Sequence, residues 1–332
     1  AKDVAIWSMI PALSFDSRER EVTATYARIG SVFGGQLVTA IVMPVVLYFS
    51  LNENGGAGDS AGWFAFAVIG GGKIGEALIA GLIAGGVPPK DIHVANRRPE
   101  RGKELVEAYG IIDFVDHQQA TDGTDVVFLC VKPKDTVPVL ADLADFIDNN
   151  ESDTAVISMA AGVTLKQLED AVSAGTPVVR VMPNTPMLVG EGMNVVVPGR
   201  FVSEEQLDSI VELLGMVGDV VVTEETHMDA VTALSGSAPA YIFLVAEAMV
   251  DAGVSLGLSR DLAKRLTVGA VSGAGAMLSQ PDAEPYELRS HVASPGGTTI
   301  AAIRALEEGG IRAAMYRATE ASARRSRELG QG

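Results

Sequence analysis

Cysteine and histidine are scarce in this sequence, which has one cysteine and four histidines in 332 residues. A disulfide needs two cysteines, so the single Cys130 excludes an internal disulfide and any metal cluster built on cysteines. The histidines show no ligand spacing such as i, i+4, and we expect no metal site. Cys130 lies in the apolar run 126–131, which indicates a buried structural thiol.

Basic residues are also few: 25 Lys and Arg stand against 42 Asp and Glu, and the formal net charge is −17. This charge argues against nucleic-acid binding, because the phosphates would be repelled. With 48% hydrophobic and 20% charged residues, the composition is typical of a globular protein. The chain is long enough for two domains.

The stretch 65–98 carries the clearest pattern. Its apolar run 65–69 predicts a buried parallel strand, residues 76–83 predict a helix, and 92–95 predict a second strand. Glycines with the spacing G-x-G-x-x-G follow the first strand. This spacing alone is weak evidence, but in a strand–helix–strand context it predicts a dinucleotide-binding site.

Each glycine of the motif has its own physical reason. Gly70 allows the tight turn from strand to helix, Gly72 lets the backbone approach a pyrophosphate, and Gly75 lets the helix pack against the strand. Lys73 and Ile74 lie between Gly72 and the predicted helix and are expected to bind the cofactor, together with the free N–H groups at the start of that helix, which attract the phosphate charge.

The end of the second strand selects the cofactor. An NAD site usually has an acidic residue there to hold the ribose 2′-hydroxyl, whereas this chain has Asn96, Arg97 and Arg98. Two guanidiniums suit a 2′-phosphate. We therefore expect NADPH, with NADH as the alternative cofactor; a solvated arginine pair in a loop is the simpler interpretation of the two arginines.

Strands and helices continue to alternate as far as about residue 223, which indicates an α/β fold with a doubly wound parallel sheet. Further strands are expected at 112–115, 125–131, 155–159 and 178–182, with helices at 99–109, from 132 to about 147, and after 164. Ligands bind at the carboxyl ends of such strands. Seven residues are expected there on the cofactor side: Val131, Lys132, Pro133, Ala160, Ala161, Gly162 and Asn184. Asn184 offers a donor and an acceptor for a nicotinamide, but it also suits an ordinary turn.

From 224 to 332 the pattern is helical. Helices are expected at 240–252, 260–278, 299–308 and 311–329, and several are apolar on more than one face, as in a bundle or a subunit interface. We therefore expect a homodimer. Two glycine-rich turns, 235–241 and 294–299, are expected to break the helices. The second opens a helix whose N–H groups could bind a carboxylate, although an ordinary helix cap and turn is the favoured interpretation of this segment taken alone.

The first 64 residues differ from the rest. The uncharged stretch at 29–51 predicts a transmembrane helix, with a buried core helix as the alternative, and the glycine-rich residues 52–62 predict a flexible join. Residues 1–52 resemble a loop and helix of sugar–cation symporters of the melibiose-carrier type, mainly through Asp16, Arg18, Glu19, Arg20 and Arg28. One helix cannot build a transport pathway, so this segment is interpreted as a fused fragment or an artefact.

Seven motifs occur in order along residues 65–329: VIGGGKIGEALIAGL, Asn96-Arg97, CVKP, AAGV, VMPNTP, LSGSAPAY and SPGGTTIAAI. In this order and spacing they resemble the pyrroline-5-carboxylate reductase family. The resemblance implies a Rossmann-type domain at 65–223, a helical dimerisation domain at 224–332, and a homodimer or a decamer built from dimers. It also implies a cytoplasmic enzyme, with membrane association through 29–51 as an alternative that we do not favour.

The resemblance further implies the reaction and its residues. Hydride from NADPH reduces the cyclic imine of 1-pyrroline-5-carboxylate to L-proline, at a site between one subunit's nucleotide domain and the partner's helical domain. The substrate carboxylate would be held by Ser294, Gly296, Gly297 and Thr298, and the catalytic Thr299 would hydrogen-bond the ring nitrogen.

Two other functions compete with this one. A β-hydroxyacid dehydrogenase usually relies on a lysine in the first long helix of its second domain, but the corresponding helix here, 241–251, has none. A membrane transport component would need many more apolar spans than the one at 29–51. A reductase tethered to a membrane through residues 29–51 would combine the dinucleotide pattern with the apolar span.

Overall fold

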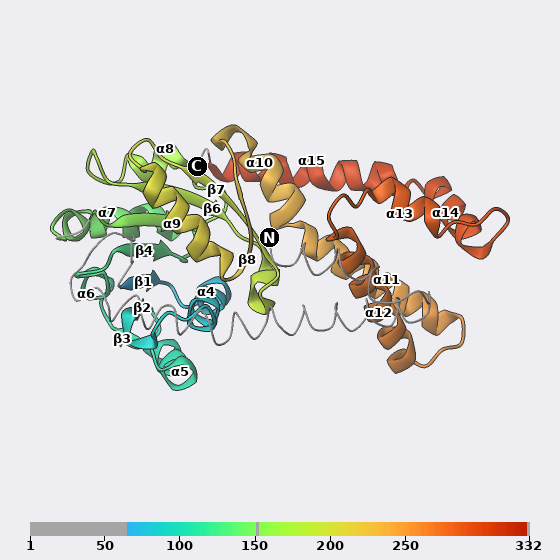
Figure 1. The fold of residues 1–332 in the computed structure, drawn as a ribbon, viewed down its shortest axis with the longest axis horizontal. Coiled ribbons are helices and arrows are strands. Elements are labelled where there is room, and N and C mark those ends of the chain that lie inside the picture. Colours follow the sequence, from blue (N-terminus) through green and yellow to red (C-terminus); the bar gives the residue numbers. More distant parts are fainter. Residues whose placement is uncertain (1–64, 151–152, 331–332) are drawn as a thin grey trace, which may run out of the picture. The chain divides into compact units, whose positions relative to one another are not determined.

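A computed structural model describes residues 65–150 and 153–330. The chain divides into two compact units, 1–60 and 61–332, and all described residues belong to the second. The predicted membrane helix at 29–51 and the predicted join at 52–62 lie outside the described residues. The second unit consists of an eight-stranded sheet with its covering helices, followed by a series of helices (Figure 1).

The sheet has the strand order β3-β2-β1-β4-β5-β6-β7-β8. Its strands are β1 Phe66–Ile69, β2 Ile92–Ala95, β3 Ile112–Phe114, β4 Val126–Leu129, β5 Ala155–Ser158, β6 Val178–Met182, β7 Gly192–Pro198 and β8 Gly218–Val222. The first six strands are parallel neighbours, which confirms the expected doubly wound α/β fold. The chain reverses direction across the sheet between β1 and β4, because β2 and β3 lie on one side of β1 and all later strands on the other.

The sheet is mixed, which corrects the expectation of a purely parallel one. Strand β7 pairs antiparallel with β6, and β8 pairs parallel with β7. The connections explain this arrangement. Only the short 3-10 turn η3 (Thr185–Val189) joins β6 to β7, so the chain folds back on itself, whereas helix α9 (Glu204–Gly215) provides the crossover from β7 to β8.

Strand β1 is buried on both faces because its side chains alternate between two cores. Phe66 and Val68 pack in one core with leucines of α4 and α9, while Ala67 and Ile69 pack in the other with leucines of α7. Burial on both faces is the reason that this strand is a continuous apolar run. The helices around the sheet are α4 Lys73–Ala84, η2 Pro89–Asp91, α5 Pro99–Tyr109, α6 His117–Thr121, α7 Pro133–Asp148 and α8 Leu165–Glu169.

The helical part begins directly after the sheet. Its elements are η4 Glu225–His227, α10 Met228–Val231, η5 Thr232–Gly236, α11 Ala238–Ser255, α12 Arg260–Leu278, α13 Pro285–His291, α14 Thr298–Glu308 and α15 Ile311–Gly330. The change from strand to helix falls between Val222 and Glu225, close to the predicted boundary at 223/224. The division into two domains stays a prediction, since residues 61–332 form one compact unit.

The glycine-rich segment 235–241 does not break the helices as expected. Residues 232–236 form a π-helical turn, and α11 starts at Ala238, so the segment connects α10 to α11 along one helical path. Pro239 fits because it occupies the first turn of α11, where its missing N–H would lack a partner in any case. The other glycine-rich turn, 294–299, does lie between two helices, α13 and α14.

Most of the helical part is exposed in the single chain. Helices α11, α13 and α14 contain no buried residue, and large apolar side chains of α11 are open, including Phe243 at 65% and Leu244 at 66% exposure. Contiguous apolar surface of this kind marks an interaction site.

Candidate functional site

A cleft of about 620 Å³ lies at the carboxyl ends of β1 and β4, where the strand order reverses. In open α/β sheets this switch point is where ligands bind. All residues that line the cleft fall between 69 and 139. They are Ile69, Gly70, Gly71, Gly72, Ala95, Asn96, Arg97, Arg98, Pro99, Arg101, Val115, His117, Cys130, Val131, Lys132, Asp135, Pro138 and Val139.

The glycine turn is shaped by close backbone contacts. Gly70 has φ +104°, and a Cβ there would lie 2.9 Å from the carbonyl carbon and oxygen of Cys130. A Cβ at Gly75 would overlap the carbonyl oxygen of Gly70. Both glycines are therefore required by the fold. A Cβ at Gly72 would meet no atom within 4 Å, so this residue opens toward the cleft, where a phosphate could approach the start of α4.

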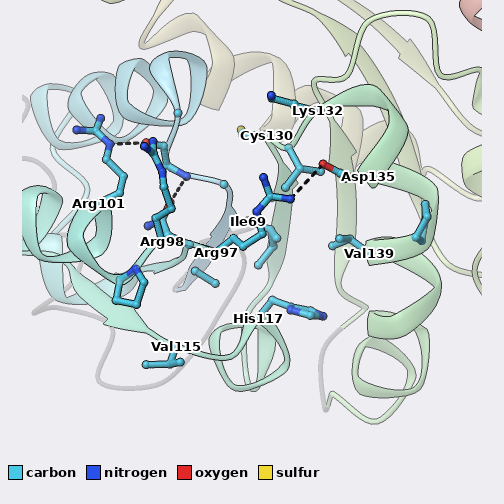
Figure 2. A pocket seen from close by; sticks show the side chains of 18 residues that line it. Ile69, Arg97, Arg98, Arg101, Val115, His117, Cys130, Lys132, Asp135 and Val139 are labelled. Atoms are coloured by element: carbon cyan, nitrogen blue, oxygen red, sulfur yellow. Dashed lines mark hydrogen bonds and ion pairs between the residues drawn. The ribbon is translucent and has the colours of Figure 1, made fainter.

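Asn96 and the two arginines after it leave β2 at the cleft. The backbone N–H of Gly71 donates to Asn96 Oδ1 at 2.7 Å. Arg97 is 84% exposed, and Figure 2 shows its guanidinium directed toward Asp135, 3.9 Å away in the first turn of α7. Arg98 is exposed as well. An exposed ion pair of this length contributes little, so both guanidiniums remain able to bind a 2′-phosphate.

Apolar residues form another part of the cleft. Val115 follows β3 and is 84% exposed, and Pro138 and Val139 come from α7. Such a surface suits the flat face of a base. With the glycine turn and the arginine pair, the cleft contains suitable partners for the adenine, the 2′-phosphate and the pyrophosphate of a dinucleotide.

Cys130 lies at the end of β4 and lines the cleft. Burial raises the pKa of its thiol to about 12, and its Sγ lies 3.7 Å from Met159 Sδ. The group is therefore protonated at neutral pH and is no nucleophile, in agreement with the structural role expected for it.

The cleft gathers seven of the predicted cofactor residues: Gly70, Gly72, Asn96, Arg97, Arg98, Val131 and Lys132. Lys73 lines an adjacent cleft of about 380 Å³ together with Arg98 and Arg101. Ile74, Gly75, Pro133, Ala160, Ala161, Gly162 and Asn184 line neither of the two clefts. The assignment of all fifteen residues to the cofactor stays a prediction.

Gly162 and Asn184 have contacts that sequence reasoning did not foresee. Gly162 has φ +78° and is buried under the end of α15, where a Cβ would lie 2.7 Å from Leu329 Cβ. Asn184 donates through Nδ2 to the Ser235 carbonyl at 3.2 Å and accepts through Oδ1 from the Met193 N–H at 2.9 Å. Both polar atoms of this amide thus connect β6 to β7 and to the π-helical turn.

Sequence reasoning missed several lining residues. Arg101, His117 and Asp135 lie in the first turns of α5, α6 and α7, the helices that follow β2, β3 and β4. Their positions in the sequence could have identified them, because the first turn of a helix that follows a parallel strand faces the carboxyl edge of the sheet. Among the described residues, no group of three or more His, Cys, Asp and Glu could hold a metal ion.

The turn 294–299 presents the start of α14. Gly296 has φ +70°, Gly297 is the N-cap, and no side chain caps this helix. The N–H of Gly297 donates to the Ser294 carbonyl at 3.0 Å, while Thr298 and Thr299 are exposed. Free N–H groups in the first turn of a helix attract anions. No residue of this turn lines the cleft.

Three family models match the chain. One described as pyrroline-5-carboxylate reductase dimerisation matches residues 225–329, and one described as NADP oxidoreductase, coenzyme F420-dependent, matches 65–162. A third, described as MFS/sugar transport protein, matches 1–75, and nearly all of that match lies outside the described residues.

Curated relatives and solved structures resemble the chain over most of its length. A pyrroline-5-carboxylate reductase of Corynebacterium melassecola is 57% identical over 80% of this chain and 98% of its own. One of Mycobacterium tuberculosis is 42% identical over 81% of this chain and 97% of its own. The structure of such a reductase from Coxiella burnetii has a TM-score of 0.75 at 36% identity, covering 81% and 99% of the two chains. One from Plasmodium falciparum with NADP bound has a TM-score of 0.73 at 26% identity, covering 82% and 100%.

Proposed function

Since the chain belongs to the pyrroline-5-carboxylate reductase family, we propose that the dinucleotide cleft of one subunit and the 294–299 turn of its partner together form the catalytic site. The chain is an NADPH-dependent oxidoreductase that reduces the cyclic imine of 1-pyrroline-5-carboxylate to L-proline. The two alternatives, a β-hydroxyacid dehydrogenase and a transport component, are not favoured, because curated pyrroline-5-carboxylate reductases match about 80% of this chain and nearly all of their own length.

The observation that carries the proposal is the separation of the two halves of the site. Among the described residues, the cleft is lined by residues of the range 69–139, and the uncapped start of α14 is exposed outside it. The dimerisation match at 225–329 contains the turn, and the exposed apolar side chains of α11 belong to the same region. A second subunit that covers this surface would bring its own turn to the cleft, which supports a homodimer.

The residues of the chain have distinct tasks in this site. The N–H groups at the start of α14, with Gly296 and Gly297, hold the substrate carboxylate. The Thr299 hydroxyl hydrogen-bonds the ring nitrogen and orients the imine, and a proton from water reaches the nitrogen along this contact. NADPH supplies the hydride. Arg97 and Arg98 bind the 2′-phosphate, and the glycine turn binds the pyrophosphate.

Substitution of Thr299 tests the assignment. For Thr299→Ala we expect kcat to fall roughly tenfold to a hundredfold, since one hydrogen bond to a charged ring nitrogen is lost, while the Kd for NADPH stays unchanged. Steady-state NADPH oxidation with pyrroline-5-carboxylate gives kcat, and calorimetric titration gives Kd. Thr299→Ser should keep most of the turnover. The matched control is Thr319→Ala, a half-buried helical threonine whose hydroxyl donates to carbonyls of its own helix. Unchanged turnover in Thr299→Ala would remove Thr299 from the site.

Three finer points belong to the same proposal. The enzyme acts in the cytoplasm, where NADPH is available, and its dimers assemble into a decamer. Residues 1–52 are a fused fragment of a symporter of the melibiose-carrier type, in line with the transporter match at 1–75. The relatives are matched almost completely by the remaining part of the chain.

A further inference from the structure

The middle glycine of the phosphate-binding turn is held on both of its backbone groups. The Gly71 N–H donates to Asn96 Oδ1 at 2.7 Å, and the Gly71 carbonyl accepts from Arg101 Nε at 2.8 Å. A Cβ at Gly71 would overlap Leu105 and lie 2.8 Å from Asn96 Oδ1. The turn is thus fastened to the end of β2 and to α5, and its conformation depends on side chains outside the glycine motif.

Arg101 uses its other donors on two carboxylates. Nη2 donates to Glu76, and Nη1 donates to Glu104 at 2.9 Å. The Tyr109 hydroxyl lies 3.4 Å from the second oxygen of Glu76. The hydrogen bond with Glu104, and then that with Glu76, raises the pKa of Arg101, although burial opposes the change. Unlike the exposed Arg97, this arginine is 22% exposed, and its charge is matched within the protein.

Glu76 makes this arrangement relevant to the cofactor. It lies in the first turn of α4, the helix whose N-terminus faces the cleft. An unpaired carboxylate in that turn would repel a pyrophosphate, and it would offset the attraction of the helix N-terminus. The ion pair with Arg101 neutralises this charge. Arg101 therefore acts on the phosphate site in two ways, through the Gly71 carbonyl and through Glu76.

We propose that Arg101 is a positioning residue for the dinucleotide: it fixes the Gly71 peptide and neutralises Glu76, and it does not bind the 2′-phosphate. Because it acts on the part of the site that binds pyrophosphate, its loss affects NADPH and NADH equally. Arg97 and Arg98, by contrast, distinguish the two cofactors. The proposal concerns the cofactor cleft alone and is independent of how the imine is bound.

The test is calorimetric titration of the full chain with NADPH and with NADH, in the absence of imine. Arg101→Lys keeps the positive charge, but one ammonium group cannot donate hydrogen bonds to Gly71, Glu76 and Glu104 at the same time. We expect its Kd to rise for both dinucleotides by a similar factor, about tenfold, and Arg101→Gln to show a larger rise, again equal for both. The matched control is Arg200→Lys, whose Nε bonds the Glu169 carboxylate outside the cleft; both of its Kd values should stay unchanged.

Hydrogen–deuterium exchange provides a second measurement that needs no cofactor. In Arg101→Lys, amides of the 70–72 turn should exchange faster than in the parent protein, and in Arg200→Lys they should not. A rise in Kd for NADPH alone would make Arg101 a ligand of the 2′-phosphate and overturn the proposal. Unchanged Kd values together with a lower melting temperature would show that Arg101 contributes to stability alone, and this result would also overturn the proposal. Exchange at 70–72 that is unaltered in Arg101→Lys would also contradict it.

Discussion

At the scale of single residues, three arginines around the cleft lie in two different environments. Arg97 and Arg98 extend from the end of β2 and are exposed, whereas Arg101, in the first turn of α5, is bonded to a carbonyl and two carboxylates. Sequence position alone predicted the first two, because they stand where the ribose lies in a dinucleotide site. It could not predict the third, because two of its partners, Glu76 and Gly71, are 25 and 30 residues away along the chain.

Removal of the exposed pair tests the preference for NADPH. We expect Arg97→Ala combined with Arg98→Ala to raise the KM for NADPH by roughly tenfold to a hundredfold, since charge-assisted hydrogen bonds to the 2′-phosphate are lost. The KM for NADH should change far less. Initial rates at varied cofactor concentration measure both.

A control for the loss of two positive charges is Arg324→Ala combined with Arg325→Ala, a neighbouring pair on α15 that lines neither of the two clefts. Both KM values should remain close to those of the parent protein. Equal increases for NADPH and NADH in the Arg97/Arg98 variant would argue that these side chains do not contact the 2′-phosphate.

At the scale of elements, the hydrophobic pattern predicted the strands that form continuous apolar runs in the sequence. Strands β1 and β4 are buried on both faces and appear in the sequence as unbroken apolar runs. Strand β7 was not predicted: Asn194 interrupts its apolar residues, and its antiparallel pairing depends on the short turn η3, which carries no long-range signal. The π-helical turn at 232–236 was also beyond sequence reasoning, because Ser and Gly indicate a turn locally while packing keeps the path helical.

The contact between β1 and α4 supplies a test at this scale. For Gly75→Ala we expect the melting temperature to fall by roughly 3 to 8 °C, because the methyl group would overlap the Gly70 carbonyl and α4 would have to shift. The affinity for both dinucleotides should fall as well. Calorimetric unfolding and cofactor titration measure the two effects.

Gly215→Ala is the matched control, because a Cβ at this helical glycine meets nothing within 4 Å. Replacing glycine there should leave the melting temperature unchanged or raise it slightly. If Gly75→Ala were as stable as this control and bound cofactor normally, the close packing of the glycine turn on α4 would not constrain the fold.

At the scale of the whole molecule, the exposed helices need a partner. The helical run Glu225–Ser255 is long and apolar enough to cross a membrane by length and composition, and only 6% of its apolar window is buried. The same run opens the dimerisation match at 225–329, so a second subunit accounts for its composition. The sequence predicted this surface, since apolar side chains around a helix need cover on all sides, but it could not show which residues a single chain leaves open.

Mixed dimers test whether two subunits share the site. One variant carries Arg97→Ala and Arg98→Ala, and the other carries Thr299→Ala. If cleft and turn come from different subunits, mixing the two variants after reversible dissociation should restore about a quarter of the parent activity, because half of the dimers are mixed and each has one intact site. NADPH oxidation before and after mixing, at an NADPH concentration well below the KM of the Arg97/Arg98 variant, measures the recovery. No recovery, with mixed dimers confirmed by mass spectrometry, would place both halves of the site in one subunit.

The bond from Gly71 to Asn96 has a consequence for the evolution of cofactor choice. Asn96 accepts the Gly71 N–H with its side-chain oxygen, and an aspartate at this position would offer a carboxylate oxygen to the same N–H. It would also bring the negative charge that NAD sites use for the ribose hydroxyls. The acceptor that shapes the turn is thus common to both kinds of site. During evolution, substitutions at positions 96–98 alone could therefore change the preference between NADPH and NADH. The glycine turn, the strand before it and the helix after it would keep their structure.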